Sequence, residues 1–323
     1  MLLSWWSFIP ILFSICCPVL RLVDNCTHLD ILETGQPNWI LIMNSALMRF
    51  PFFKKDMEHT MKGLICYYSG SGNTKLACEY IAKSQGIPFE LVDIVKEKEV
   101  DFKPYDIAGF ATFTDFGGPP YLFEAFVQGL PMQEGKPAFV FNTYGFISGK
   151  TLRTMERQVS GKGFTVLAGY SLHTPESYPP MIAGGRGNEE APDVKEMEAF
   201  NAFAKELEKH LENLGKGRRI SGKTIRIGLL NSIIPKLSRT TAKRDMGDKY
   251  VDESLCTECG TCERLCPYKA IRMSSKPVFD MEKCYGCWRC YNKCPERAIY
   301  TNKFRGAPHY PKPNESLKKK LSP

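Results

Sequence analysis

The strongest constraint on this chain is a pair of cysteine runs near its C-terminus, at residues 256–267 and 284–295. Both runs read C-x2-C-x2-C-x3-C-P, and each ends an internal repeat unit in Cys-Pro-x-x-Ala-Ile. Three thiolates on one tight loop can bind three corners of an iron–sulfur cube, so the runs predict two [4Fe–4S] clusters. Structural zinc usually uses separated Cys pairs, and neighbouring Cys on short loops are poor disulfide partners.

The spacing resembles that of bacterial two-cluster ferredoxins, in which the fourth cysteine of each run binds the other cluster. This resemblance divides the eight cysteines into two sets of ligands. Cluster one takes Cys256, Cys259, Cys262 and Cys294. Cluster two takes Cys284, Cys287, Cys290 and Cys266. Ile271 and Ile299, at matching places in the repeat, are expected to share a small core between the two halves.

Upstream of the runs, short apolar segments alternate with amphipathic ones, which is typical of a parallel α/β sheet. We expect strands at 63–68, 89–94, 107–113, 138–143 and 165–171. We expect helices at 75–83, 121–128, 151–159 and 194–214. This pattern predicts an α/β fold, a flavodoxin-like doubly wound five-stranded parallel sheet, followed by a small α+β two-cluster domain of the ferredoxin type.

The first expected strand leads into a glycine-rich loop made of Ser69, Gly70, Ser71, Gly72, Asn73 and Thr74. Glycines let successive N–H groups face inward as an anion nest, and the following helix N-terminus adds partial positive charge. The loop is not a dinucleotide-binding fingerprint, because Lys75 occupies the position of the third glycine of G-x-G-x-x-G. It is not a P-loop either, because it does not end in Gly-Lys-Ser/Thr. Such a run is often only a turn. Its place after the first strand of an α/β unit favours a site for a phosphate monoester.

This loop resembles the FMN-phosphate loop of flavodoxins, (Ser/Thr)-x-(Ser/Thr)-Gly-x-Thr, at every specified position. The resemblance implies that the loops after the third and fourth strands hold the isoalloxazine ring of FMN. The residues there are Thr112, Phe113, Thr114, Phe116, Gly117, Gly118, Asn142, Thr143, Tyr144 and Gly145. Phe113, Phe116 or Tyr144 can stack on the flavin, and each can equally pack in the core.

A flavodoxin-like domain joined to a two-cluster module resembles the EFR-type flavodoxin–ferredoxin fusion family of anaerobic bacteria, over residues 61–301. The resemblance implies an electron-transfer protein that passes electrons between FMN and two [4Fe–4S] clusters to a redox donor and acceptor. Two alternatives stay open: a ferredoxin module with a non-flavin α/β docking domain, and a flavin-dependent reductase of an organic substrate. No catalytic acid or base is evident, so the chain is expected to be either an electron carrier or an oxidoreductase.

Five segments are expected along the chain. They are an atypical apolar N-terminal extension at 1–60, an FMN-binding domain at 61–214, a basic linker at 215–246, the ferredoxin-type domain at 247–302 and a flexible tail at 303–323. The Pro- and Gly-rich stretch 175–192 is expected to form a mobile loop over the flavin edge. Arg186 and His173 are the titratable side chains near it that we single out. Cys66 and Cys78 lie in apolar segments and are expected to be small core residues.

The formal net charge of +8 is concentrated at residues 216–244, which hold many Lys and Arg and no acid. Because no nucleic-acid-binding motif accompanies them, we expect no nucleic-acid partner. Oxygen-sensitive clusters and the cysteine usage favour a reducing compartment, hence the cytoplasm. Residues 1–20 are apolar but lack a charged n-region and a cleavage site, so we favour a start-codon extension over a signal peptide or a membrane anchor. A membrane partner is expected only if residues 1–20 are an anchor.

Overall fold

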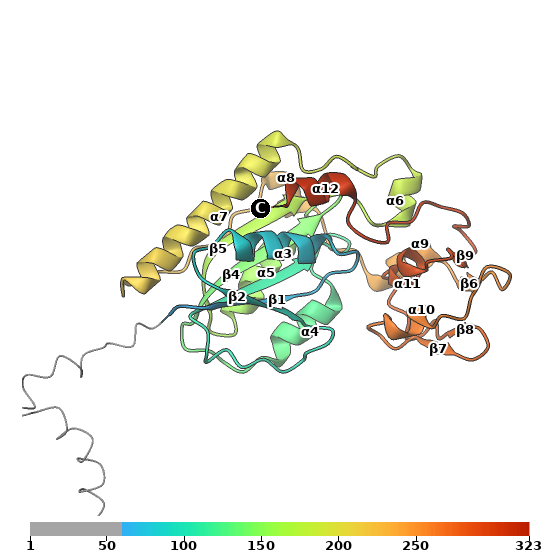
Figure 1. Cartoon of the computed structure of the whole chain (residues 1–323), viewed down its shortest axis with the longest axis horizontal. Coiled ribbons are helices and arrows are strands. Elements are labelled where there is room, and N and C mark those ends of the chain that lie inside the picture. The colour runs from blue at the N-terminus through green and yellow to red at the C-terminus, as the bar shows by residue number, and fades with distance from the viewer. Residues whose placement is uncertain (1–59, 323) are drawn as a thin grey trace, which may run out of the picture. The chain divides into compact units, whose positions relative to one another are not determined.

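Five apolar segments pair into one parallel sheet in the computed structural model, which describes residues 60–322 (Figure 1). The strand order is β2-β1-β3-β4-β5, and every neighbouring pair is parallel. The strands are β1 (Gly63–Tyr67), β2 (Phe89–Asp93), β3 (Ile107–Phe113), β4 (Pro137–Tyr144) and β5 (Thr165–His173). This is the flavodoxin-like strand order, so the predicted fold class is confirmed. The expected N-terminal extension and possible anchor lie almost wholly in residues 1–59, outside the described residues.

Helices cover both faces of the sheet, and β1 shows why. Leu64 and Cys66 pack in one hydrophobic core while Ile65 and Tyr67 pack in the other, because successive strand residues point to opposite faces. One core is closed by α4 (Tyr121–Gly129) and α5 (Thr151–Ser160). The other is closed by α3 (Asn73–Lys83) and α7 (Val194–Gly215). Each of these helices and strands was expected from the sequence, with ends that differ by no more than two residues.

Burial also explains the two cysteines outside the runs. Cys66 on β1 and Cys78 on α3 are fully buried, and burial raises the pKa of each thiol far above its usual value. Both are therefore protonated and unreactive core residues, as expected.

Shorter helices follow the sheet: α6 (Pro179–Ala183), α8 (Leu229–Ile233), α9 (Arg239–Met246) and α12 (Glu315–Lys320). The last of these differs from the expected flexible tail. Leu317 and Leu321 are almost completely buried in the same core as α3 and α7, and the Asn314 side chain caps the helix by accepting from the Leu317 N–H at 2.8 Å. These two apolar residues, four apart in sequence, lie on one face of the segment and attach it to the core. Within residues 60–322, no helix has the length and apolarity that a membrane span needs.

The cysteine runs fold as two copies of one strand–loop–helix–strand unit. The first copy comprises β6 (Lys249–Val251), α10 (Thr261–Arg264) and β7 (Ile271–Met273), and the second β8 (Pro277–Phe279), α11 (Arg289–Lys293) and β9 (Ile299–Thr301). The copies are interlocked, since β6 pairs antiparallel with β9 and β7 with β8. Ile271 and Ile299 share the core of this part, together with Trp288 and Tyr291.

Candidate cofactor sites

The eight cysteines of the runs line two separate cavities. Cavity one is lined by Cys256, Cys259, Cys262 and Cys294. Cavity two is lined by Cys284, Cys287, Cys290 and Cys266. The fourth cysteine of each run therefore reaches the cavity of the other run, which is the arrangement that the spacing predicts. All ten cysteines among residues 60–322 are free thiols, so no disulfide competes for them there.

Local polar groups suit these thiols to bind metal. The N–H of Ala270 donates to Cys266 Sγ and that of Ala298 to Cys294 Sγ, each at 3.3 Å and at matching places in the repeat. Burial raises the pKa of Cys287 to about 11, so this thiol stays protonated until iron displaces the proton. Among the described residues, no group of three or more His, Cys, Asp or Glu converges on a single metal ion. The thiols instead surround a space.

A single buried cation distinguishes cavity two. The Lys249 ammonium donates to Cys284 Sγ at 3.2 Å, and the residue is 8% exposed. Burial alone would lower the pKa of Lys249, but the thiolate charges of Cys290 and Cys284 outweigh it and raise the pKa. The direction of this shift favours the charged form of Lys249 beside the sulfurs.

The glycine-rich loop forms the turn from β1 into α3. Gly72 caps the helix with a φ of 117°, a left-handed conformation that a side chain would strain. The Ser69 hydroxyl accepts from the N–H groups of Gly72 and Lys75 at 3.1 and 3.3 Å. The Thr74 hydroxyl contacts that of Thr143 at 2.9 Å, which ties the loop to the end of β4. Hydrogen bonds of Ser69 and Thr74 thus stabilise this turn.

A cavity of about 60 Å³, here called the loop cavity, lies against this turn. Eight of the predicted cofactor residues line it: Gly70, Ser71, Asn73, Phe113, Thr114, Thr143, Tyr144 and Gly145. Three of these, Phe113, Thr114 and Gly145, also line the larger cavity described next. Ser69, Gly72 and Thr74 shape the turn without lining the cavity.

Two cations that the sequence interpretation missed reach the glycine-rich loop from α11. Arg289 Nη1 donates to the Ser69 carbonyl at 3.2 Å, and Lys293 Nζ donates to the Ser71 carbonyl at 3.1 Å. Arg289 also lines the loop cavity, and its Nε is buried without a hydrogen-bond partner in the described structure. The glycine-rich loop has no positive side chain of its own and therefore receives positive charge from the cysteine-rich part.

The C-terminal segment adds the other side of this loop. The Tyr310 hydroxyl donates to Asn73 Oδ1 at 3.0 Å. A Cβ added at Gly72 would lie 2.8 Å from Cδ of Pro313, so the segment leaves room for glycine only. Residues expected to form a flexible tail thus pack directly on the predicted phosphate site.

A larger cavity of about 430 Å³, here called the ring cavity, lies beyond the loop cavity. Its predicted lining residues are Phe113, Thr114, Phe116, Gly117 and Gly145. Tyr285, Gly286, Cys287 and Trp288 of the second cysteine run line it as well. Cys287 therefore borders both the ring cavity and cavity two. Arg186, from the Pro- and Gly-rich stretch, also lines the ring cavity, as does Tyr178.

Three of the predicted ring-site residues lie outside both of these cavities. Thr112 is fully buried in β3, and Gly118 packs against the Lys236 side chain. Asn142 is fully buried and donates to the Thr114 hydroxyl at 3.0 Å, so it supports a lining residue from behind. Of the three aromatic candidates, Phe113 and Phe116 line the ring cavity, whereas Tyr144 lines only the loop cavity.

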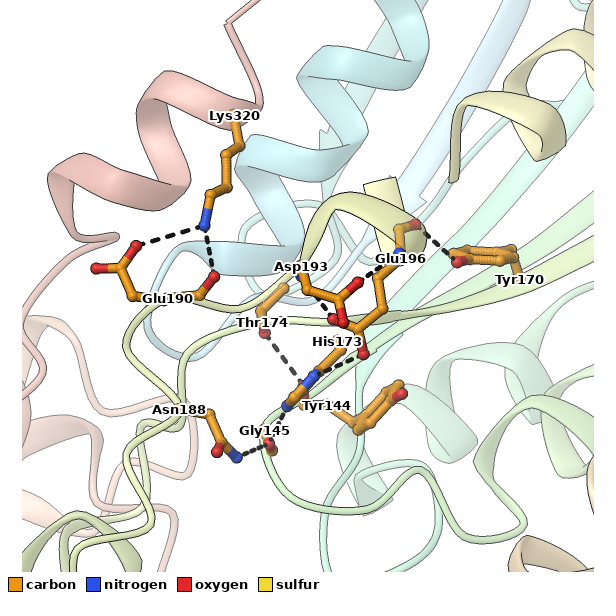
Figure 2. A network of polar contacts seen from close by, with 10 residues as sticks. All are labelled: Tyr144, Gly145, Tyr170, His173, Thr174, Asn188, Glu190, Asp193, Glu196 and Lys320. Carbon is orange, nitrogen blue, oxygen red and sulfur yellow. Dashed lines mark hydrogen bonds and ion pairs between the residues drawn. The ribbon is translucent and has the colours of Figure 1, made fainter. Parts of the chain in front are cut away.

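His173 has a supporting position, which Figure 2 shows. Its ring stacks on Tyr144 with centroids 5.1 Å apart. One ring nitrogen lies 2.9 Å from a Glu196 carboxylate oxygen and the other 2.8 Å from the Gly145 carbonyl oxygen, which Asn188 also contacts (Figure 2). With both nitrogens engaged, His173 fixes the β4 loop and does not line either cavity.

Trp288 is the most unusual residue at the ring cavity. Its φ of 59° is left-handed, a conformation that costs a bulky residue free energy. Gly260, the matching residue of the first repeat, has a φ of 67°, so the turn itself belongs to the repeat. The tryptophan is 2% exposed, contacts Tyr178, and has an indole N–H without a partner among the described residues. Strain and an unpaired donor at a cavity wall are features of a binding site.

A polar cluster fixes the cysteine-rich part beside the ring cavity. Asp115 accepts from the Tyr285 hydroxyl at 2.7 Å and pairs with Arg239 at 2.9 Å. The Arg239 guanidinium lies 3.4 Å from the centroid of the Tyr285 ring. These contacts join β3's loop, α9 and the second cysteine run, so the basic stretch 215–246 carries a structural contact as well as a connection.

Comparison with known proteins assigns the cysteine-rich part. Residues 249–272 and 277–300 each match the model of the 4Fe-4S binding domain. No curated protein matches the chain. Similar solved structures include a flavodoxin from the domain Archaea, with 18% identity and a TM-score of 0.34 over 47% of this chain and 99% of that one. The Streptococcus pneumoniae TIGR4 flavodoxin gives 19% identity and a TM-score of 0.36 over 46% and 99%. Rubredoxin oxygen:oxidoreductase from Desulfovibrio gigas has 18% identity and a TM-score of 0.37, and the match covers 47% of this chain and 36% of that one.

The strand order and the matched repeats together define the class of this chain. It joins a flavodoxin-like parallel sheet to a pair of 4Fe–4S-binding repeats, as the resemblance implied. Two repeats with two cysteine-lined cavities indicate two [4Fe–4S] clusters.

Proposed function

We propose that this chain is a flavo-iron–sulfur electron-transfer protein that holds FMN beside two [4Fe–4S] clusters. When bound, the clusters supply one-electron chemistry and the flavin supplies one- or two-electron chemistry. The observation that carries the proposal is the position of Cys287. This predicted ligand of cluster two also lines the ring cavity, so the chain brings the two kinds of cofactor site together.

The residues around the ring and loop cavities suit FMN in three respects. The glycine-rich loop presents backbone N–H groups at the start of α3, where a phosphate is favoured. Arg289 adds a positive charge at the same cavity. The ring cavity, at about 430 Å³, has aromatic walls and an indole N–H with no partner among residues 60–322. These features favour a flavin domain over a docking domain without flavin.

The protein's own residues hold the sites and connect them. Asp115, Tyr285 and Arg239 fix the second cysteine run against the β3 loop. Tyr285 and Cys287 line both the ring cavity and cavity two. Cys259 is exposed, whereas Cys284 and Cys290 are buried. We therefore propose that cluster one faces the redox partner, in a reducing compartment such as the cytoplasm.

Cofactor analysis of anaerobically purified full-length protein tests this function. We expect about eight iron atoms per chain, since each cubane holds about four, together with FMN released on denaturation. The Ser71→Ala variant should lose FMN and keep its iron, because Ser71 lines only the loop cavity. The Cys287→Ser variant should lose the electron paramagnetic resonance (EPR) signal of one cluster. Full iron with no FMN in the unaltered protein would contradict the flavin assignment and favour the docking alternative.

A further inference from the structure

The two halves of the cysteine-rich part repeat in backbone but differ in charge. The repeat is offset by 28 residues, so that Cys256 corresponds to Cys284 and Ile271 to Ile299. The residue seven places before the first cysteine is Lys249 in one copy and Pro277 in the other. Both residues line a cavity, Lys249 cavity two and Pro277 cavity one. A charged and an uncharged residue therefore occupy the same place in the repeat.

The rest of the charged lining reinforces this difference. Cavity two is lined by Lys249 and Arg289 and by no acid, whereas cavity one is lined by Glu258 and Glu296 and by no base. Both acids at cavity one are exposed, and Glu258 is paired with Lys276 at 3.0 Å, so water and a counter-charge screen them. Lys249 is 8% exposed and has no carboxylate partner in the described range. Its charge is therefore screened less than those of the two acids at cavity one.

We propose that Lys249 makes cluster two a stronger electron acceptor than cluster one. Reduction of a [4Fe–4S] cluster adds one electron and neither forms nor breaks a bond, so it adds one negative charge beside Lys249. A buried ammonium 3.2 Å from a ligand sulfur stabilises that added charge with little screening. Cluster one has Pro277 at the matching place, so no ammonium contacts its ligand sulfurs there. Lys276 and Arg264 lie nearby, but they donate to the backbone carbonyls of Cys256 and Cys259, and Glu258 pairs with Lys276.

The placement of Lys249 gives this difference a direction. Cavity two shares Cys287 with the ring cavity, and cavity one includes the exposed Cys259. Electrons entering at cluster one are therefore drawn toward the interior and the ring cavity. This directional statement rests on the proposed function, whereas the difference between the clusters does not depend on flavin.

An EPR-monitored potentiometric titration of the full chain with both clusters, reduced by dithionite, tests the proposal. We expect two reduction waves, of which the one at higher potential belongs to cluster two. Lys249→Met should lower the equilibrium constant for reduction of that cluster at least tenfold, which moves its midpoint potential down by 59 mV for one electron. For the wave at lower potential, the equilibrium constant for reduction should change by less than threefold. Lys249→Arg keeps the positive charge, so its higher-potential wave should stay close to that of the unaltered protein. Iron content of each variant, measured in parallel, verifies that both clusters are present.

Lys249→Gln keeps a hydrogen-bond donor but loses the charge, so it separates the effect of charge from that of hydrogen bonding. It also takes the place of Lys249→Met if that variant does not assemble both clusters. Glu296→Gln is the matched control at cavity one, where an exposed charge should move neither wave by more than threefold. The proposal is overturned if the shift is below tenfold, if both waves move equally, or if the wave that moves is the lower one. It is also overturned if Lys249→Arg shifts the wave as far as Lys249→Met. Absence of FMN would instead contradict the proposed function and leave these shifts unaffected.

Discussion

The charge that α11 brings to the glycine-rich loop leads to a quantitative prediction for Arg289→Met. Arg289 Nη1 lies 3.2 Å from the Ser69 carbonyl oxygen and the residue lines the loop cavity, so its charge would act on an anion held there. Two unit charges about 4 Å apart attract by about 1 kcal/mol in water and by more where water is partly excluded, so we expect this charge to contribute about 1–2 kcal/mol to the binding of a phosphate monoester. FMN affinity should therefore fall about five- to thirtyfold.

Riboflavin distinguishes charge from packing, because it has the same ring and no phosphate. Full-length protein freed of flavin, with its clusters retained, would be titrated with each flavin while flavin fluorescence is recorded. Arg289→Met should weaken FMN binding and leave riboflavin binding within twofold. Arg264→Met is the matched control, since this arginine on α10 bonds the Cys259 carbonyl instead of the loop. An equal loss of affinity for both flavins, or no loss for FMN, would refute the electrostatic argument.

Two further predictions concern stability. Leu317→Ala should lower the free energy of unfolding by about 2–4 kcal/mol in denaturant titrations, because it opens a cavity beneath a fully buried side chain. Exposed Lys319→Ala is its control, and equal effects of the two would mean that α12 is not anchored on the core. Asp115→Asn should cost about 1–3 kcal/mol, since it leaves Arg239, which is 24% exposed, without its ion pair beside Tyr285. A change under about 0.5 kcal/mol would show that this cluster does not hold the two parts together.

Most of the fold was predictable because its signals are local. Apolar runs of strand length, amphipathic helices and the Gly72 turn each depend on neighbouring residues, and all of them appear in the structure. The division of the eight cysteines between two cavities also followed from their spacing.

The features that could not be predicted from the sequence are contacts between segments that lie far apart in the chain. Arg289 and Tyr310 lie more than two hundred residues beyond the loop that they contact, and no local pattern marks them. The packing of α12 was missed because its two core leucines stand among three lysines, which read as a solvated tail. Trp288 gave one usable signal, since it occupies the place that Gly260 holds in the other repeat.

The packing of α12 also bears on the order in which the chain can mature during synthesis. Leu317 shares a core with Ile65 of β1, although both cysteine runs lie between them in the sequence. A ribosome must therefore translate the whole iron–sulfur part before the core beside α3 is complete. Tyr310 reaches Asn73 of the glycine-rich loop only at the same late stage. The glycine-rich loop therefore acquires its full set of contacts only after nearly the whole chain has been synthesised.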